Sequence, residues 1–367
     1  MTYEIPQLED KVVPAAQQLP PNSEYLKHLD ISGRDGLIRL ASNENTDRPS
    51  PDVERALTLS YLEANLSPPP VPQLALELAA RHRLDPTQVL VTAGSTEVID
   101  ATLRTFVRAG EEVVLPAPSW PVCQRRLKAL EARVIEVPLD SDDRRWYYDV
   151  TSYLDAMTPA TKLVFVCTPN NPTGNTMELP DLRRLADTGI PLLVDGAYCD
   201  FDPGVDVVAL VREYENVVLT RTFSKAYCLA GLRIGYALGS TKVLGYVERL
   251  LVPGSAVSSA SLSAGLAALR DDAYHHAQTT RIIAERDRLL GAFRDLGVRA
   301  WEARGNFVPV DARDFPGRAD GLAGAILEHG IVVRPFGDVL RISVGLPHEN
   351  DAVIAAVASA VSEAPIR

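Results

Sequence analysis

The chain has 367 residues, 46% hydrophobic and 23% charged, which is enough length and apolar surface for two domains with cores of their own. Its 48 acidic residues outnumber 37 basic ones, and the formal net charge of −11 disfavours nucleic acid or an anionic membrane as a partner. The sequence shows no apolar run of membrane-spanning length and no signal peptide at its start, so a cytoplasmic protein is expected.

Metal chemistry and disulfide bonds are not expected. The adjacent His275 and His276 suit a solvated helix face better than a metal site, and no H-E-x-x-H motif occurs. The cysteines are widely spaced, contain no C-x-x-C pair and are interpreted as small core residues: Cys123, Cys167, Cys199 and Cys228.

The elements predicted in chain order are those of an α/β protein. Residues 1–40 are rich in Pro, Gln and charge and predict an arm with little core of its own. Further along, the pattern of 95–110 predicts a helix that buries Ile99, Leu103 and Phe106 and ends at Gly110. Short runs of branched aliphatic residues predict strands buried on both faces of a parallel sheet: QVLVTAG, EEVVLPAP, ARVIEVPL, KLVFVCTP, PLLVDGAY and NVVLTRT.

After about residue 245 the pattern changes. The stretch 270–298 predicts one long helix with inward-facing Ile282, Leu289, Phe293 and Leu296, and a helix over NDAVIAAVASAV closes the chain. Short strands are predicted between them, in NFVPVDA, IVVRPFG and VLRISVG. We therefore expect an arm at 1–40, a large α/β domain at 41–245 and a smaller α+β domain at 246–367.

Polar residues follow four of the predicted strands, and ligands bind at the carboxyl ends of strands in open α/β sheets. Gly94, Ser95 and Thr96 open a helix, whose free N–H groups can hold a phosphate, and Thr222, Ser224 and Arg233 can add hydroxyls and a cation. Taken alone, these residues are better explained as a plain Gly-Ser turn beside a surface arginine than as a phosphate site. The motifs of ATP and dinucleotide binding are absent from the sequence.

Asp195 and Lys225 indicate the ligand. A carboxylate at the end of an aliphatic run needs a cation, although such an Asp can also be a helix cap. A lysine among apolar neighbours has a lowered pKa, which makes it a nucleophile toward aldehydes. An amine, a phosphate cradle and an aspartate that needs a cation together predict pyridoxal 5'-phosphate.

The residues also resemble a known family. The ordered set LASNEN, TPNNPTG, DGAY, TFSKAYCLAGLRIGY, NFV and VLRISVG is similar to fold type I pyridoxal-phosphate aminotransferases, most of all the histidinol-phosphate aminotransferase group. The resemblance covers roughly residues 20 to 362. It implies a mostly parallel central sheet between helices, a smaller α+β C-terminal domain, amino acid and oxo-acid substrates, and a homodimer.

The resemblance also implies roles for individual residues. Lys225 joins the cofactor aldehyde and moves the reacting proton, Asp195 pairs with the ring nitrogen, and Trp120 stacks on the ring, although Trp120 can also be a core residue. Asn171 and Tyr198 bind the ring hydroxyl. The phosphate is held by Gly94, Ser95, Thr96, Thr222, Ser224 and Arg233. Arg341 matches the arginine that binds the substrate carboxylate, and Asn43 and Asn306 are further candidates for the substrate pocket. Apart from the resemblance, Arg334 is a spare cation that can meet an acidic or phosphorylated substrate tail, although an exposed arginine explains it equally well.

Four departures from the histidinol-phosphate group fall on the substrate side. Ser67 stands where that group has a tyrosine reaching the partner subunit, Gly254 stands where it has L-P-Y, NENTDRP replaces N-E-N-P-Y-G-P, and Gly196 replaces a glutamate. We therefore expect transamination with glutamate as donor and an oxo acid or aldehyde as acceptor, with a substrate other than histidinol phosphate. A pyridoxal-phosphate decarboxylase, cyclase or lyase is the alternative, because this scaffold supports those reactions too. A DNA-binding regulator is disfavoured by the net charge and the lack of a basic N-terminal helix-turn-helix.

Overall fold

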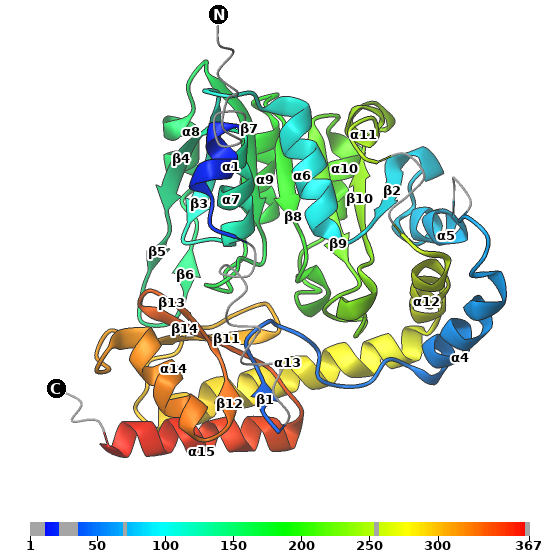
Figure 1. The fold of residues 1–367 in the computed structure, drawn as a ribbon. Helices are drawn as coiled ribbons and strands as arrows, with labels where there is room; N and C mark the ends of the chain where they lie inside the picture. Colours follow the sequence, from blue (N-terminus) through cyan, green and yellow to red (C-terminus); the bar gives the residue numbers. More distant parts are fainter. Residues whose placement is uncertain (1–11, 22–35, 69–71, 253–256, 364–367) are drawn as a thin grey trace, which may run out of the picture.

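A computed structural model describes residues 12–21, 36–68, 72–252 and 257–363 of the chain, and a seven-stranded sheet forms its centre (Figure 1). In sheet order the strands are β2 Val89–Thr92, β10 Gly235–Gly239, β9 Val217–Thr222, β8 Leu192–Asp195, β7 Thr161–Cys167, β3 Glu112–Ala117 and β4 Arg133–Pro138. β10 is antiparallel to both neighbours, and the other pairs are parallel. The predicted α/β class with a mostly parallel sheet is confirmed.

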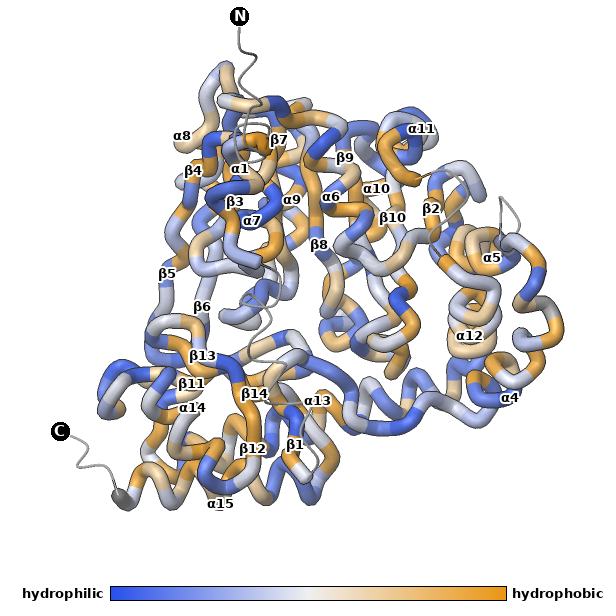
Figure 2. Tube along the Cα trace, in the orientation of Figure 1, coloured by the Kyte–Doolittle hydropathy of each residue, from blue (hydrophilic) through white to orange (hydrophobic). Residues whose placement is uncertain are grey.

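The sheet is buried between two layers of helices because successive side chains of a strand point to opposite faces. In β7, Leu163 and Phe165 pack into one layer, while Val164 and Val166 pack into the other. Figure 2 shows the central strands as mostly hydrophobic along their length. The first layer contains α6 Ser95–Phe106, α7 Pro121–Ala129 and α11 Thr241–Glu248. The second contains α5 Gln73–His82, α8 Val150–Ala156, α9 Leu179–Ala186, α10 Val208–Glu213 and α12 Ser259–Arg270, with α4 Pro51–Ser60 at its edge.

A smaller α+β unit lies below the large sheet in the view of Figure 1. Its antiparallel sheet has the order β11 Phe307–Asp311, β14 Val339–Ser343 and β13 Arg334–Phe336. A parallel pair, β1 Ile38–Arg39 and β12 Ile331–Val332, lies beside it. The helices of this unit are α13 Asp272–Asp295, α14 Arg318–Glu328 and α15 Pro347–Glu363. The remaining short elements are α1 Pro14–Gln18, β5 Asp140–Ser141, β6 Trp146–Tyr147 and the 3-10 helices η2 Tyr61–Glu63, η3 Pro86–Gln88, η4 Cys199–Phe201 and η5 Ala230–Leu232.

The six predicted strands of the large sheet are all present, but β4 lies at the edge of the sheet and is not buried on both faces as predicted. Three other local details differ from the prediction. The helix α6 ends at Phe106 rather than at Gly110, because Val107 is already extended and Gly110 instead donates its N–H to the Glu131 carbonyl at 2.9 Å. The predicted run 331–337 is two strands, which are separated at Val333. The antiparallel strand β10 was not predicted, because its glycine-rich sequence GYALG contains no run of branched aliphatic residues.

The predicted domain boundaries at residues 40 and 245 stay predictions, and the packing favours different junctions. Leu262 and Leu269 of α12 lie in the core of the large sheet, which places the change of unit near the start of α13. At the other end, β1 pairs with β12, and Leu40 belongs to the core of the smaller unit. Cys123, Cys167, Cys199 and Cys228 are all free thiols. Within the described ranges, no helix has the length and apolar character needed to cross a membrane.

Candidate active site

The carboxyl ends of β2, β7, β8 and β9 meet the smaller unit at a cavity of about 330 Å³. This is the edge at which the sequence predicted a ligand. Twelve of the predicted site residues line the cavity: Ser95, Thr96, Trp120, Asn171, Asp195, Tyr198, Thr222, Ser224, Lys225, Arg233, Arg334 and Arg341. The structure therefore brings together residues that lie far apart in the sequence.

Lys225 is a partly buried lysine in the turn after β9. Its Nζ donates to the Ser42 carbonyl at 2.8 Å. Burial lowers the pKa of Lys225 to about 7, helped by the positive charges of Arg341 and Arg233 and opposed by the carboxylates of Glu44 and Asp195. A large fraction of the amine is therefore neutral near neutral pH, which is what a nucleophile toward an aldehyde requires.

Asp195 is a buried carboxylate at the end of β8. Its Oδ1 accepts hydrogen bonds from the Thr220 hydroxyl at 2.9 Å and from the Ala197 N–H at 3.3 Å. Burial raises the pKa of Asp195, while these hydrogen bonds and the charge of Lys225 oppose the rise. In the described part of the chain no Lys, Arg or His side chain forms an ion pair with Asp195. The carboxylate is thus placed to receive a cationic group from a ligand in the cavity.

The start of α6 is built as an anion site by two glycines. Gly94 has φ of +87°, and a Cβ atom there would lie 2.7 Å from the Arg233 guanidinium. A Cβ atom on Gly235 would lie 2.3 Å from the Ser95 backbone nitrogen. Only glycine therefore allows Arg233 and β10 to approach the helix N-terminus so closely. Nearby, the Thr222 and Ser224 hydroxyls lie 3.0 Å apart on the cavity wall. This combination of helix N-terminus, hydroxyls and guanidinium suits a phosphate group.

Tyr198 presents its hydroxyl between two asparagines. It accepts hydrogen bonds from Asn43 Nδ2 at 2.9 Å and from Asn171 Nδ2 at 3.1 Å. Burial raises the pKa of Tyr198 to about 12, so the hydroxyl keeps its proton. Because both asparagines act as donors, that proton can be donated to an anionic oxygen in the cavity.

Two arginines lie on the substrate side, on neighbouring positions of β13 and β14. The buried Arg341 donates to Asn171 Oδ1 at 2.6 Å and also to the Ala41 carbonyl. Arg334 and Arg341 share one aromatic ring, since their guanidinium carbons lie 5.0 and 5.1 Å from the centre of Phe336. In the described ranges Arg334 forms no ion pair, so its charge remains available to a ligand.

Comparisons with known proteins identify the family of the chain. The family model for aminotransferase class I and II matches residues 35–357. A histidinol-phosphate aminotransferase of Caulobacter vibrioides is 35% identical over 340 residues, which cover 90% of this chain and 88% of the relative. An aromatic amino acid aminotransferase of Mycobacteroides abscessus is 35% identical over 326 residues, or 87% of this chain and 92% of the relative. The chain belongs to the class I and II aminotransferase family.

A solved structure extends the likeness to the fold and the cofactor. The histidinol-phosphate aminotransferase of Sinorhizobium meliloti in complex with pyridoxal 5'-phosphate superposes with a TM-score of 0.86 at 26% identity, covering 96% of this chain and 98% of the other. The aminotransferase described here is therefore a fold type I enzyme that depends on pyridoxal 5'-phosphate. The buried Asp195, the amine of Lys225 and the anion site at α6 are the chemical groups that this cofactor needs.

Two predicted substrate residues of the aminotransferase lie outside the cavity wall. Asn43 contacts Tyr198 from behind, and Asn306 donates from Nδ2 to the Asn43 carbonyl at 3.0 Å. Their substrate role stays a prediction, and their positions favour support of Tyr198. Gly94 is likewise not part of the wall, although it shapes the anion site.

The sequence reasoning missed Ser42 and Glu44, which line the cavity on either side of Asn43. The motif LASNEN was the available signal, but only its central asparagine was selected. Of the substrate-side departures, Ser67 is exposed and Gly254 lies outside the described residues. No cluster of three or more His, Cys, Asp or Glu side chains suitable for a metal ion occurs in the described ranges.

Proposed function

We propose that this aminotransferase takes its amino group from glutamate and transfers it to an oxo acid or aldehyde, and that histidinol phosphate is not its substrate. The choice of glutamate as donor is supported by the pair of arginines in the cavity, Arg341 and Arg334. Glutamate has two carboxylates, and guanidinium groups bind carboxylates in a bidentate manner. The exposed position of Ser67 supports the exclusion of histidinol phosphate, because serine is too short to replace a tyrosine that reaches a neighbouring subunit.

The proposed cofactor roles follow from the contacts of each residue. Asp195 holds a proton at the ring nitrogen, since its buried carboxylate gains most from a cationic partner. Tyr198 and Asn171 bind the ring hydroxyl. Trp120, at the start of α7, packs against one face of the ring. The phosphate is bound by the N-terminus of α6 and by Ser95, Thr96, Thr222, Ser224 and Arg233.

When bound, pyridoxal 5'-phosphate withdraws electrons from the α-carbon of the amino acid and so acidifies its C–H bond. Lys225 Nζ is the proposed base that would take this proton from the substrate, hold it and give it back during the transfer. Its pKa of about 7 suits both directions of that transfer at neutral pH. Arg341 orients the substrate by its α-carboxylate, so that the amine of the substrate faces the end of β9.

Absorbance of the holoenzyme tests the donor. Adding L-glutamate is expected to shift the absorption band of the holoenzyme to shorter wavelength, because the absorbance of the cofactor changes when it passes from the aldehyde to the amino form. Oxo acids and aldehydes are then added one at a time, and an acceptor is recognised because it restores the original absorption band. Histidinol phosphate is tested in place of glutamate, to check that it is not a substrate. Conversion by histidinol phosphate as fast as by glutamate contradicts the proposal. Lys225→Ala serves as the control that binds the cofactor without turnover.

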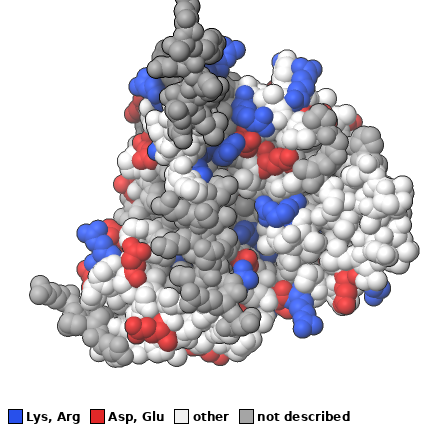
Figure 3. Space-filling view, in the orientation of Figure 1, with Lys and Arg blue, Asp and Glu red and all other residues white. Residues whose placement is uncertain are grey.

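We further propose that the enzyme acts as a homodimer. The segment 59–66, at the end of α4 and in η2, exposes Leu59, Tyr61, Leu62 and Leu66 with exposed fractions of 62 to 80%. Figure 3 shows this side of the molecule, over α4 and α5, with few charged side chains, while both signs of charge are mixed elsewhere on the same face. A contiguous exposed apolar surface is typical of a subunit interface. Tyr61→Glu is expected to shift the mass measured by light scattering from dimer to monomer.

A further inference from the structure

The loop between β1 and α4 presents three consecutive residues to the active site. The Ser42 carbonyl accepts from Lys225 Nζ at 2.8 Å, Asn43 donates to the Tyr198 hydroxyl at 2.9 Å, and Glu44 lines the cavity. Loops are held less firmly than strands. The position of these groups around Lys225 therefore depends on what holds the loop.

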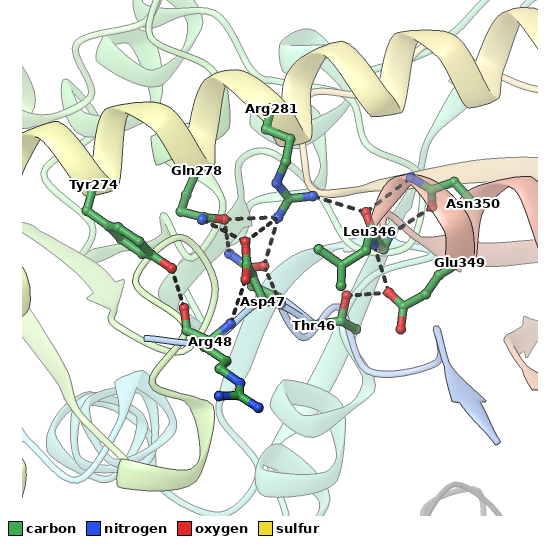
Figure 4. Close-up of polar contacts among 11 residues, drawn as sticks. Thr46, Asp47, Arg48, Tyr274, Gln278, Arg281, Leu346, Glu349 and Asn350 are labelled. Carbon is green, nitrogen blue, oxygen red and sulfur yellow. Dashed lines mark hydrogen bonds and ion pairs between the residues drawn. The ribbon is translucent and has the colours of Figure 1, made fainter. Parts of the chain in front are cut away.

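The next three residues of the loop are held by side chains of α13 and α15 (Figure 4). Gln278 of α13 donates from Nε2 to Asp47 Oδ2 at 2.8 Å and accepts from Asn45 Nδ2 at 3.4 Å. Thr46 donates its hydroxyl to Glu349 Oε2 at 2.5 Å. Residues 42–44 of the loop thus face the active site, and the next residues, 45–47, are held by the two helices.

Arg281 is the residue of α13 at which these anchors meet. Its guanidinium donates to Asn45 Oδ1 at 3.3 Å, to Gln278 Oε1 at 2.9 Å and to the Gly345 carbonyl at 3.2 Å. A carboxylate oxygen of Asp47 lies 3.7 Å from the same group. Figure 4 shows Arg281 reaching from the helix to both the loop and the segment before α15. One side chain therefore connects three segments of the chain.

Gly345 makes this connection relevant to the substrate, because it follows β14, the strand that carries Arg341. Ser343, in the same strand, binds the loop directly, since its hydroxyl contacts the Asn43 backbone N–H at 2.9 Å and the Asn43 side-chain oxygen at 3.0 Å. The strand of Arg341 and the loop beside Lys225 are thus joined at Asn43 and again at Arg281.

We propose that Arg281 is a positioning residue of the aminotransferase, which fixes loop 42–47 and the end of β14 relative to each other so that Ser42, Glu44 and Arg341 keep their places around Lys225. The proposal rests on the functions proposed above for Lys225 and Arg341. It assigns Arg281 no contact with substrate or cofactor. Lysine cannot replace it, because one ammonium group cannot reach acceptors on three segments with the fixed fork geometry of a guanidinium.

Arg288, further along α13, provides a matched control. It also joins α13 to α15, through Asp351 at 2.8 Å and the Pro347 carbonyl at 3.3 Å, and it pairs with Glu285 on its own helix. Among the described residues, Arg288 makes no hydrogen bond or ion pair with loop 42–47. Arg288→Ala therefore removes a comparable link between the two helices without releasing the loop.

The test compares Arg281→Ala and Arg288→Ala as holoenzymes, by titrating cofactor absorbance with pH. The charges that act on the Lys225 nitrogen are the carboxylates of Glu44 and Asp195 and the guanidinium groups of Arg341 and Arg233. Release of the loop moves Glu44 away, so the pKa seen in the titration of Arg281→Ala is expected to fall by about 0.5, because a lost carboxylate disfavours the protonated form. Arg288→Ala is expected to keep the wild-type value.

Steady-state kinetics with L-glutamate give the second readout. Arg281→Ala is expected to raise KM roughly fivefold or more with a kcat within about twofold of wild type, because misplaced binding groups weaken substrate binding. A purely structural defect would instead lower the active fraction, and so kcat, at an unchanged KM. If the wild type does not react with glutamate, the donor proposal fails, while the pH titration still decides the role of Arg281.

Equal titrations and equal KM values for Arg281→Ala and Arg288→Ala overturn the proposal. If Arg281→Ala does not fold, Asp47→Asn replaces it, because an amide at Asp47 removes the charge facing Arg281 and leaves one acceptor oxygen for two donors, Gln278 Nε2 and the Arg48 backbone N–H. Asp47→Asn is expected to shift both readouts in the same direction as Arg281→Ala. An Asp47→Asn enzyme with wild-type titration and KM likewise overturns the proposal.

Discussion

Thr220 donates its hydroxyl to Asp195 Oδ1 at 2.9 Å, and both side chains are buried, Asp195 in the cavity wall and Thr220 behind it. This hydrogen bond favours the ionised form of Asp195, against the rise in pKa that burial causes. Thr220 thereby helps to keep a negative charge where the ring nitrogen of the cofactor is proposed to bind. The residue follows two valines and a leucine in β9, and nothing in its local sequence distinguishes it from a core threonine.

Thr220→Val is expected to weaken binding of pyridoxal 5'-phosphate about tenfold, since a hydrogen bond to a charged group contributes about 1.5 to 3 kcal/mol. The measurement is a titration of the apoenzyme with the cofactor. Thr102→Val is the matched control, because Thr102 is also buried but its hydroxyl has no partner in the described part of the chain. Equal affinities of the two variants would contradict the role of Thr220.

The pKa of Lys225 predicts how the apoenzyme reacts with its cofactor. Only the neutral amine attacks the aldehyde, so the rate of attachment is expected to rise with pH around about 7 and then to level off. An exposed lysine would show this rise near 10.4 instead. Stopped-flow absorbance measures the rate.

Glu44→Gln tests the origin of this pKa in the same measurement of the attachment rate against pH. The carboxylate of Glu44 raises the pKa of Lys225 against the effect of burial, so its loss is expected to lower the midpoint of the rate profile. The variant should therefore react faster than wild type below neutral pH. A midpoint that moves upward would show that Glu44 does not act on Lys225 through its charge.

The parallel strands and the cofactor side of the site were predictable from sequence, because both depend on local patterns. A strand such as β7, buried on both faces, shows its aliphatic residues as one run. Asp195 ends such a run in β8, and Lys225 lies in the turn that follows β9. The antiparallel β10 was not predictable in this way. Its Gly235 is needed for the close approach to the start of α6, and its Gly239 for the close approach to α11, and both requirements arise only from tertiary packing.

The loop 42–47 shows a second kind of limit. Its residues are placed at the active site by hydrogen bonds to partners far away in the chain, such as Lys225, Tyr198 and Arg281. A single sequence does not indicate which polar loop residues meet across such distances. For the same reason Asn43 was predicted to bind substrate, whereas its contacts place it behind Tyr198.

Gly94→Ala tests the anion site at α6. The new Cβ atom would lie 2.7 Å from the Arg233 guanidinium, at a backbone φ of +87° that side chains rarely adopt. We expect an affinity for pyridoxal 5'-phosphate about tenfold weaker or more, because such strain amounts to about 1 to 3 kcal/mol. The affinity of the variant for pyridoxal, which lacks the phosphate, should differ much less from that of the wild type. This result would show that the defect lies in binding of the phosphate.

Gly291→Ala is the control for that substitution. Gly291 lies in α13, and a Cβ atom there has no neighbour within 4 Å. Alanine in a helix interior is favoured over glycine by about 1 kcal/mol, so this variant is expected to bind the cofactor normally and to unfold at a slightly higher temperature. A loss of cofactor affinity in both variants would indicate a general effect on folding rather than on the anion site.

The ion pair of Asp200 and Arg221 lies below the site, where both side chains are about nine-tenths buried and the charged groups are 2.8 Å apart. Asp200→Asn leaves the Arg221 charge buried and unpaired, and we expect it to lower the free energy of unfolding by about 3 kcal/mol or more. Asp206→Asn removes a partner of Arg212 from an exposed pair and is expected to cost less than about 1 kcal/mol. Urea denaturation of the two variants measures the difference.

The same pair predicts an acid dependence of stability. The positive charge of Arg221 holds the pKa of Asp200 well below its usual range, in spite of burial. The unfolded chain therefore takes up a proton at Asp200 at a higher pH than the folded protein does, and the stabilisation is lost as pH falls below about 4. In Asp200→Asn this part of the acid dependence disappears, so the stability gap between wild type and variant should narrow as pH falls below that value. A gap that stays constant down to pH 3, in urea titrations at each pH, would show that ionised Asp200 does not stabilise the fold.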